Sequence, residues 1–314
     1  MSARLLEAVP NFSEGRDRGT VQAIVDAMAG AGAEVVDWSA DPDHHRSVVT
    51  VIGEPGAVED AAVAGAAVAL ERIDLRRHRG VHPRIGAVDV VPFVPLVGLG
   101  MEDARASARR VGERLANELG LPVFFYGAAS DPPGRGLAEL RVGGVEALWA
   151  QWPPGRVPDV LPPRWPHPGA HPTAGAACVG ARPVLLAWNV YLQGITLPDA
   201  REIARRIRER DGGFPALRAL ALELPQTGRV QISMNLERLQ ATSPLDVLRL
   251  IETLAAEHGA EVVETEVIGM LPDELLLQAA ADRLRLRDAT LERVLSRRLI
   301  RHLERAAFTG PENE

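Results

Sequence analysis

Residues 33–53 read AEVVDWSADPDHHRSVVTVIG and contain two apolar runs separated by a polar segment. The runs, 33–38 and 46–53, are rich in β-branched side chains, which favour strands, so we predict two strands joined by a turn. Apolar residues at helical spacing precede the pair over 18–31, and an Ala-rich helix is predicted after it over 55–73. Two strands between two helices are the centre of a split β-α-β unit.

Strand-like runs on both sides complete this unit. The run RLLEAVP (4–10) precedes the first helix, and GAVDVVPFVPL (86–96) follows the second. A further helix over 101–119 and the strand PVFFYG (122–127) continue the series. The predicted order in the first half is therefore β-α-β-β-α-β, extended by one helix and one strand.

The same order is predicted a second time from residue 183 onward. Its elements are a strand at 183–192, a helix at 197–210, strands at 216–224 and 229–237, a helix at 244–258, a strand at 260–269, and helices near 272–281 and 288–306. We therefore predict an α/β (α+β) protein with two ferredoxin-like βαββαβ subdomains packed together, residues 1–180 and 181–314.

A segment rich in proline and glycine, residues 151–183, lies between the two series. A loop of this length in a folded chain is either functional or a linker. Its tryptophan and histidine content is unlike that of a flexible Gly/Ser spacer and favours a functional role. A connector on the surface remains the alternative.

The charged residues narrow the possible functions. The 314 residues carry a net charge of −7, whereas general nucleic-acid binding needs a basic face. All 35 basic residues are arginines, so mechanisms that need a lysine, such as a Walker A phosphate loop or a Schiff base, are excluded. Arginine side chains, backbone N–H groups and helix N-termini remain to bind anions.

The cysteine content and the apolar runs narrow the possible functions further. Cys178 is the only cysteine, so the chain has no internal disulfide and no multi-cysteine metal cluster. The longest aliphatic run, 61–70, is too short to span a bilayer, and the N-terminus lacks the apolar segment of a signal peptide. We expect a cytoplasmic protein that binds neither membranes nor nucleic acid.

Two histidine pairs have the spacing of metal ligands. In HRGVH (78–82) and HPGAH (167–171), the histidines are four residues apart, which on a helix places two imidazoles on one face. Gly80 interrupts the first pair and Pro168 the second, so neither segment is a good helix. A metal-dependent hydrolase that uses these pairs remains an alternative function.

His82 has features of a proton-transfer residue. It precedes Pro83, which favours an extended backbone at the histidine, and Arg84 and Asp89 follow close by. Because imidazole titrates near neutral pH, it can accept and return a proton within one turnover. The alternative is that His78 and His82 are hydrogen-bonded turn residues.

Several segments together resemble the formiminotransferase family. They are VPNFSEGR, DPDHHRSVVTVIG, HRGVHPRIGAVDVVPFVPL, PVFFYG, HPTAGAACVGARP, NVYL and QISMNLE, in this order along nearly the whole chain. The resemblance implies two α/β subdomains that form a glutamate formimidoyltransferase, which transfers a formimino group from N-formimino-L-glutamate to tetrahydrofolate in histidine degradation. It also implies small-molecule substrates, tetrahydrofolate as co-substrate without a metal, and a homodimer.

The resemblance also assigns roles to individual residues. The catalytic histidine of the family lies in its H-P-R-x-G motif, which places it at His82. The folate-contacting loop of the family corresponds to the proline-rich stretch that ends in HPTAG. The expected folate-binding residues are therefore His171, Pro172, Thr173, Ala174 and Gly175.

Other polar residues are candidates for binding the substrates. The carboxylates of the donor and of the folate tail need cationic partners, and Arg46 and Arg84 are the candidates because bidentate guanidinium groups suit carboxylates. Asn11, Asn189 and Asn235 lie at predicted strand ends within the matching motifs. Their amides are candidates for orienting the substrate.

Two departures from the family pattern leave questions open. Ser39 stands where some members carry an acidic residue, so the acid that orients His82 is not assigned. No cyclodeaminase domain follows in the 314 residues, so we expect a separate protein to process the product. A non-catalytic folate-binding relative is the third hypothesis.

Overall fold

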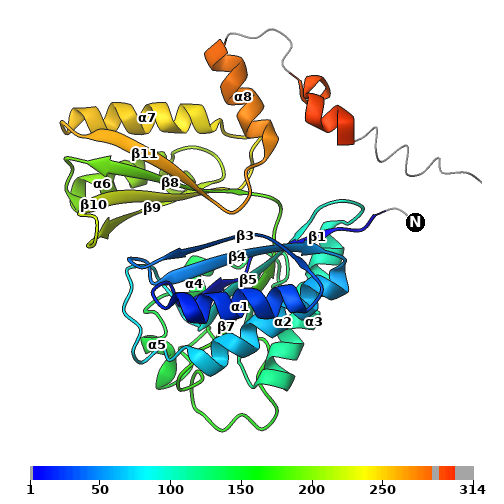
Figure 1. Cartoon of the computed structure of the whole chain (residues 1–314). Helices are drawn as coiled ribbons and strands as arrows, with labels where there is room; N and C mark the ends of the chain where they lie inside the picture. The colour runs from blue at the N-terminus through cyan, green and yellow to red at the C-terminus, as the bar shows by residue number, and fades with distance from the viewer. Residues whose placement is uncertain (1–2, 285–289, 301–314) are drawn as a thin grey trace, which may run out of the picture.

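The first half of the chain forms a seven-stranded sheet (Figure 1). The structure, a computed structural model, describes residues 3–284 and 290–300. The strands are β1 (Leu6–Ala8), β2 (Asn11–Phe12), β3 (Glu34–Asp41), β4 (Arg46–Gly53), β5 (Val88–Pro95), β6 (Val123–Gly127) and β7 (Ala177–Ala181). Because β1 and β2 both pair with β4 and with β5, the order is β3-β4-β1/β2-β5-β7-β6. The first four positions form the predicted ferredoxin-like unit.

Three helices cover one face of this sheet and enclose the main core. They are α1 (Arg18–Gly30), α2 (Pro55–Arg72) and α3 (Met101–Leu119). The N-cap of α1 is Asp17, whose side chain accepts a hydrogen bond from the Gly19 N–H. Apolar side chains from the helices and the sheet, such as Ile24, Phe93 and Leu115, are fully buried between them.

The segment 128–183, which includes the predicted loop 151–183, packs on the other face of the same sheet before it enters the last strand, β7. It contains the short helices α4 (Leu137–Leu140) and α5 (Glu146–Trp149). Leu140 and Leu148 join a second buried cluster with Phe124 of β6 and Cys178 of β7. The segment is therefore part of the first subdomain rather than a flexible spacer.

The end of this segment corrects the prediction of a loop over 151–183. Residues 177–181, ACVGA, form β7, which lies parallel between β5 and β6. All five residues are buried, so the strand lacks the alternation of apolar and polar residues that marks a half-exposed strand. Gly180 is required here, because a Cβ would lie 2.4 Å from the ring of Tyr126.

The second half of the chain confirms the second predicted unit. The strands β8 (Leu186–Gln193), β9 (Leu217–Leu224), β10 (Arg229–Leu236) and β11 (Glu261–Ile268) form an antiparallel sheet in the order β11-β8-β10-β9. Helices α6 (Leu197–Ile207) and α7 (Pro244–Glu257) pack on one face. Helix α6 ends before the predicted residue 210, and a 3-10 turn follows at Glu209–Asp211.

The C-terminal part of the described chain is helical. Helix α8 (Asp273–Leu284) corresponds to the helix predicted near 272–281. Within the helix predicted over 288–306, Leu291–Arg293 is a 3-10 turn and residues 295–300 are helical, while residues 288–289 and 301–306 lie outside the described residues. No helix in the described ranges has the length and apolar character needed to cross a membrane.

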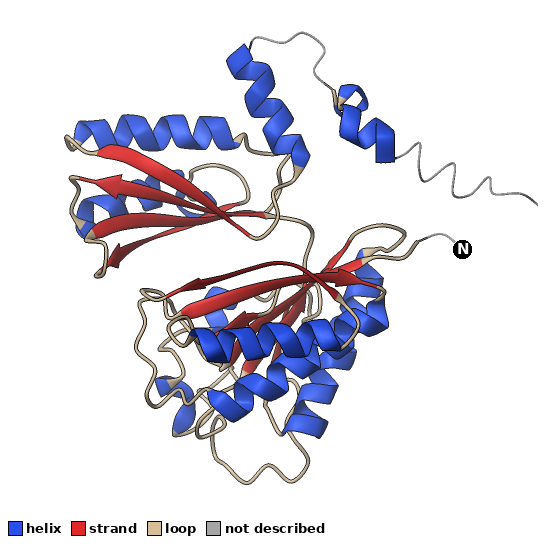
Figure 2. Ribbon diagram, in the orientation of Figure 1, coloured by secondary structure: helices blue, strands red, loops and turns tan. Residues whose placement is uncertain are grey.

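The helix-free face of the second sheet lies toward the part of the first sheet that contains β3 and β4 (Figures 1 and 2). A hydrogen bond joins them, since the backbone N–H of Gln226 donates to Asp43 Oδ1 at 3.0 Å. Gly269, after β11, is also close to the first sheet, because a Cβ there would lie 3.4 Å from Thr50 Oγ1. The α/β architecture of two packed subdomains therefore agrees with the prediction from sequence.

Candidate active site

The two histidine–proline motifs are joined through their backbones just before β5. The N–H of Ala87 donates to the carbonyl of Ala174, and the N–H of Ala176 donates to the carbonyl of Ile85, both at 2.9 Å. These bonds align HPRIG with HPTAG, although the two motifs are far apart in the sequence. The predicted catalytic segment and the predicted folate loop thus form one structural unit.

The half-buried imidazole of His82 lies in the loop before β5. Its Nδ1 donates to the carbonyl of Pro83 at 2.8 Å, which leaves Nε2 unprotonated in the neutral ring. The ring of His44 lies near it, with centroids 5.7 Å apart. Burial, followed by the positive charges of Arg46 and Arg141, lowers the pKa of His82 well below its ordinary value of 6.5. A neutral ring with an unprotonated Nε2 is the form that a general base needs.

Asp89 is the buried centre of an arginine cluster. Its Oδ2 accepts from Arg46 Nη1 at 2.6 Å and also from Arg141 Nη2. Its Oδ1 accepts from the backbone N–H of Ile85 at 2.8 Å, which ties the cluster to the loop of His82. Burial alone would raise the pKa of Asp89, but the charges of Arg141 and Arg46 lower it well below its ordinary value. Asp89 is therefore a carboxylate that holds two guanidinium groups in place.

Asn11 contacts the same cluster. Its Oδ1 accepts from Arg46 Nε at 3.1 Å, and its Nδ2 donates to the carbonyl of Val9 at 2.6 Å. Both ends of the amide are thus engaged within the protein. Of the predicted substrate-binding residues, Asn11 and Arg46 are brought together, and Asn11 orients the arginine.

His78 lies in a separate arrangement of side chains. Its ring is buried and stacks on that of His45 with centroids 4.1 Å apart, and its Nε2 donates to the carbonyl of His45 at 2.7 Å. His45 Nε2 is in turn 3.1 Å from a carboxylate oxygen of Glu14. Burial lowers the pKa of His78 to about 4. His78 and His82 therefore have different neighbours, and no group of three potential metal ligands is present among the described residues.

The five predicted folate-binding residues form a tight turn. Two backbone hydrogen bonds of 2.9 Å between His171 and Gly175 close it. Inside the turn, His171 Nδ1 accepts from the N–H of Ala174 at 3.1 Å, and the carbonyl of Thr173 accepts from the segment after α2. Pro172 is exposed at the tip. The turn is thus fixed in shape beside the loop of His82.

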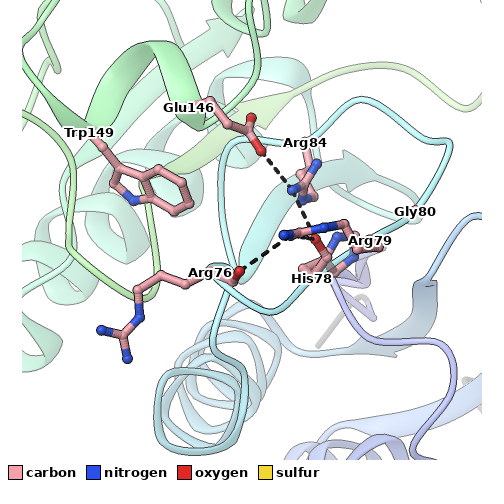
Figure 3. Close-up of a pocket in the computed structure, with 7 residues that line it drawn as sticks. All are labelled: Arg76, His78, Arg79, Gly80, Arg84, Glu146 and Trp149. Carbon is pink, nitrogen blue, oxygen red and sulfur yellow. Dashed lines mark hydrogen bonds and ion pairs between the residues drawn. The ribbon is translucent and has the colours of Figure 1, made fainter.

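A cavity of about 450 Å³ lies next to this turn (Figure 3). It is lined by Arg76, His78, Arg79, Gly80, Arg84, Glu146 and Trp149. Trp149 Nε1 donates to the carbonyl of His171 at 3.2 Å, which connects the cavity wall to the turn. Arg84 Nη2 donates to Glu146 at 3.0 Å. The cavity offers an aromatic ring on one side and guanidinium groups on the other.

Asn189 and Asn235 lie on the second sheet, and within the described residues no side-chain hydrogen bond links them to this cluster. Asn189 is in the middle of β8, not at a strand end as predicted, and its Nδ2 donates to Glu266 at 3.1 Å. Tyr191 donates its hydroxyl to the same carboxylate oxygen at 2.6 Å. Asn235 is exposed near the end of β10. The structure therefore does not join these two asparagines with His82.

The chain matches two domains of a known family over almost its whole length. The N-terminal subdomain of the formiminotransferase domain matches residues 5–182, and the formiminotransferase domain that follows it matches residues 187–300. The chain belongs to the formiminotransferase family. A glutamate formimidoyltransferase of Thermoplasma acidophilum is 38% identical over 94% of this chain and 97% of its own length. One of Streptococcus pyogenes serotype M1 is 34% identical over 91% of this chain and 95% of its own.

The chain also matches about half of a longer relative. The formimidoyltransferase-cyclodeaminase of Rattus norvegicus is 35% identical over 89% of this chain but only 52% of its own length. The present chain therefore corresponds to about half of that protein.

Several residues of the site were missed by the sequence analysis. Arg141 and Trp149 come from the segment that covers β5, β7 and β6, and His44 comes from the turn before β4. No short motif marks Arg141, because its partner Asp89 is far away in the sequence. His44 stands in the DPDHHR segment, where the adjacent histidines were a signal for a polar site near Arg46.

Proposed function

We propose that this formiminotransferase is a glutamate formimidoyltransferase. It transfers the formimino group of N-formimino-L-glutamate to N5 of tetrahydrofolate and releases L-glutamate, with 5-formimino-tetrahydrofolate as the other product. The observation that carries this proposal is the backbone pairing of HPRIG with HPTAG, which brings His82 next to the turn expected to bind folate. The names of the full-length relatives agree with it.

His82 moves the proton in this proposal. The attacking nitrogen must lose a proton, and the departing nitrogen of glutamate must gain one. The lowered pKa of His82 keeps its ring neutral near pH 7, so Nε2 can accept the first proton and return it to the leaving nitrogen. The hydrogen bond from Nδ1 to the Pro83 carbonyl keeps the ring in the required tautomer.

We place the folate against the turn 171–175 and the adjoining cavity. The aromatic ring of Trp149 suits the flat part of the molecule, and the guanidinium groups of Arg84 and Arg79 suit the carboxylates of its tail. These side chains fit tetrahydrofolate as a co-substrate. We assign Arg46, which Asn11 orients, to binding the formimino donor. We assign Asn189 and Asn235 to substrate contacts made from the second sheet.

The family also leads to proposals about the whole protein. We propose subdomains of residues 1–180 and 181–314, a homodimer, a cytoplasmic location and a role in histidine degradation. Light scattering coupled to size-exclusion chromatography tests the dimer directly, since a mass near 33.8 kDa would contradict it.

One assay tests the activity. The purified protein is incubated with tetrahydrofolate and N-formimino-L-glutamate, and the released L-glutamate is measured. Release that depends on both substrates supports the proposal. Folate binding without release would indicate a non-catalytic folate-binding protein instead, and release that is unaffected by omitting folate and abolished by chelators would indicate a metal-dependent hydrolase.

A further inference from the structure

The arginine cluster at Asp89 carries more positive than negative charge. Arg46 and Arg141 both donate to the single oxygen Oδ2 of Asp89, so the three side chains have one net positive charge. Asp89 is fully buried, and the side chains of Arg46 and Arg141 are only 10% and 14% exposed. Because an uncompensated charge away from water is unfavourable, this cluster favours an anion as its partner.

The surrounding residues do not compensate this charge. The nearby arginines have carboxylates of their own, Arg84 with Glu146 at 3.0 Å and Arg135 with Asp159 at 2.5 Å. In the described part of the chain, no second carboxylate forms an ion pair with Arg46 or Arg141. The ring of His82 is neutral near pH 7 and does not compensate the positive charge of the cluster.

Arg141 is fixed in position, yet one of its N–H groups has no hydrogen-bond acceptor. Arg156 donates to the carbonyls on either side of it, to Leu140 at 3.1 Å and Val142 at 2.5 Å, which fixes the backbone there. The Nε of Arg141 is buried and has no hydrogen-bond partner among the described residues. A buried donor of this kind normally meets a ligand or a water molecule.

We propose that this cluster binds the α-carboxylate of the formimino donor and that Arg141 is the residue that selects it. The inference rests on the proposed function. The α-carboxylate is attached to the carbon that bears the reacting nitrogen, whereas the γ-carboxylate is at the far end of the side chain. Because Asp89 also binds the backbone N–H of Ile85 in the loop of His82, an α-carboxylate on the cluster places the formimino carbon beside the imidazole.

Three donors and two proteins test this assignment. The donors are N-formimino-L-glutamate, its α-amide and its γ-amide, and the proteins are the wild type and Arg141→Met. With wild type, the α-amide is expected to lower kcat/KM by about 10- to 100-fold, mainly through KM, as for the loss of a charge-assisted hydrogen bond. The γ-amide is expected to react within about threefold of the parent donor, a change too small for a lost charged contact.

The variant is expected to remove the discrimination. Arg141→Met lowers kcat/KM for N-formimino-L-glutamate by a similar factor and shows no further loss with the α-amide, because both changes remove the same contact. Arg141→Lys keeps the charge and is expected to restore part of the difference between the donors. Arg205→Gln, on the exposed face of α6, is the matched control and keeps the wild-type values.

Other outcomes overturn the assignment. It is wrong if the wild type does not distinguish the α-amide, or if Arg141→Met loses the same factor with every donor. If Arg141→Met does not fold, Arg141→Gln undergoes the same comparison, and unchanged discrimination overturns the assignment. A wild-type protein that converts none of the donors overturns the proposed function instead. Calorimetry then tests the site alone. The wild type should bind L-glutamate more tightly than its α-amide, and Arg141→Met should bind the two equally. Any other result overturns the site.

Discussion

Gly86 and Gly175 form a bridge in which a side chain on either residue would meet a carbonyl oxygen. A Cβ on Gly86 would lie 2.3 Å from the oxygen of Ala176, and one on Gly175 would lie 2.0 Å from the oxygen of Ile85. Gly175 also has a φ of +69°, which only glycine adopts at low cost. The close contact between the two motifs therefore depends on both glycines.

Gly175→Ala is expected to damage stability and folate binding together. The strained φ costs about 1–2 kcal/mol, and the clash with Ile85 adds to it and displaces the turn 171–175. Urea unfolding measures the first effect, and the KM for tetrahydrofolate measures the second. Gly155→Ala is the matched control, since Gly155 has a φ of +76° with open space around it. Equal losses in the two variants would show that the packing against Ile85 is unimportant.

His82→Gln is expected to lower kcat by about 10²- to 10⁴-fold, the usual contribution of a general acid–base group. The side chain is half-buried in a loop, so the variant should fold and bind tetrahydrofolate as the wild type does. Steady-state release of L-glutamate and fluorescence titration with folate are the measurements. Full activity of the variant would exclude His82 as the proton-transfer residue, whatever the substrate.

The pH dependence of the reaction should report the charge of Arg141. Burial and the charges of Arg46 and Arg141 lower the pKa of His82, so the acid limb of kcat/KM is expected below pH 6.5, with activity lost as the pH falls through that pKa. Arg141→Met removes a positive charge, which raises the pKa and moves the limb to higher pH. Formamidine, which has no carboxylate, is the donor of choice for this profile. A limb that stays in place or moves to lower pH would contradict the electrostatic role.

His78 should make the fold sensitive to mild acid. Its pKa is about 4 in the folded protein against 6.5 in the unfolded chain, so between these values the unfolded chain binds more protons. The stability linked to His78 is therefore present above pH 6.5 and is lost as the pH falls toward 4, by up to about 3 kcal/mol. Urea unfolding from pH 7 to 4 measures this loss. His78→Gln should flatten the dependence, whereas replacing the exposed His167 by Gln should leave it unchanged.

Asp89→Asn is expected to destabilise the protein strongly, by about 3–5 kcal/mol, because it leaves two neighbouring guanidinium groups without their carboxylate. The double variant Asp89→Asn/Arg141→Met removes one of the two charges and should recover part of the loss. Urea unfolding of the two single variants and the double variant gives the coupling energy. Additive losses would mean that Asp89 and Arg141 do not interact energetically.

Much of the fold was predictable from local patterns. The β-branched runs at 33–38 and 46–53 and the helical spacing around them predicted the ferredoxin-like unit. Strand β4 occupies the second run, and β3 covers most of the first and continues to Asp41, into the predicted turn. Strand β7 was not predictable in this way. Its five residues are buried on one face under α3 and on the other under α4 and α5, so no period distinguishes the strand from a loop.

The two-unit architecture, the absence of lysine chemistry and the family motif that contains His82 were readable without a structure, because each depends on residues close together in the chain or on composition. The surroundings of that histidine depend on how the chain folds. The turn that supports the loop of His82 lies beside it because the parallel strands β5 and β7 begin at the same end of one sheet. Arg141 completes the cluster at Asp89 because the segment after β6 folds back over the face of that sheet. A contact between distant residues leaves no local pattern, and its charge balance becomes visible only once the chain is folded.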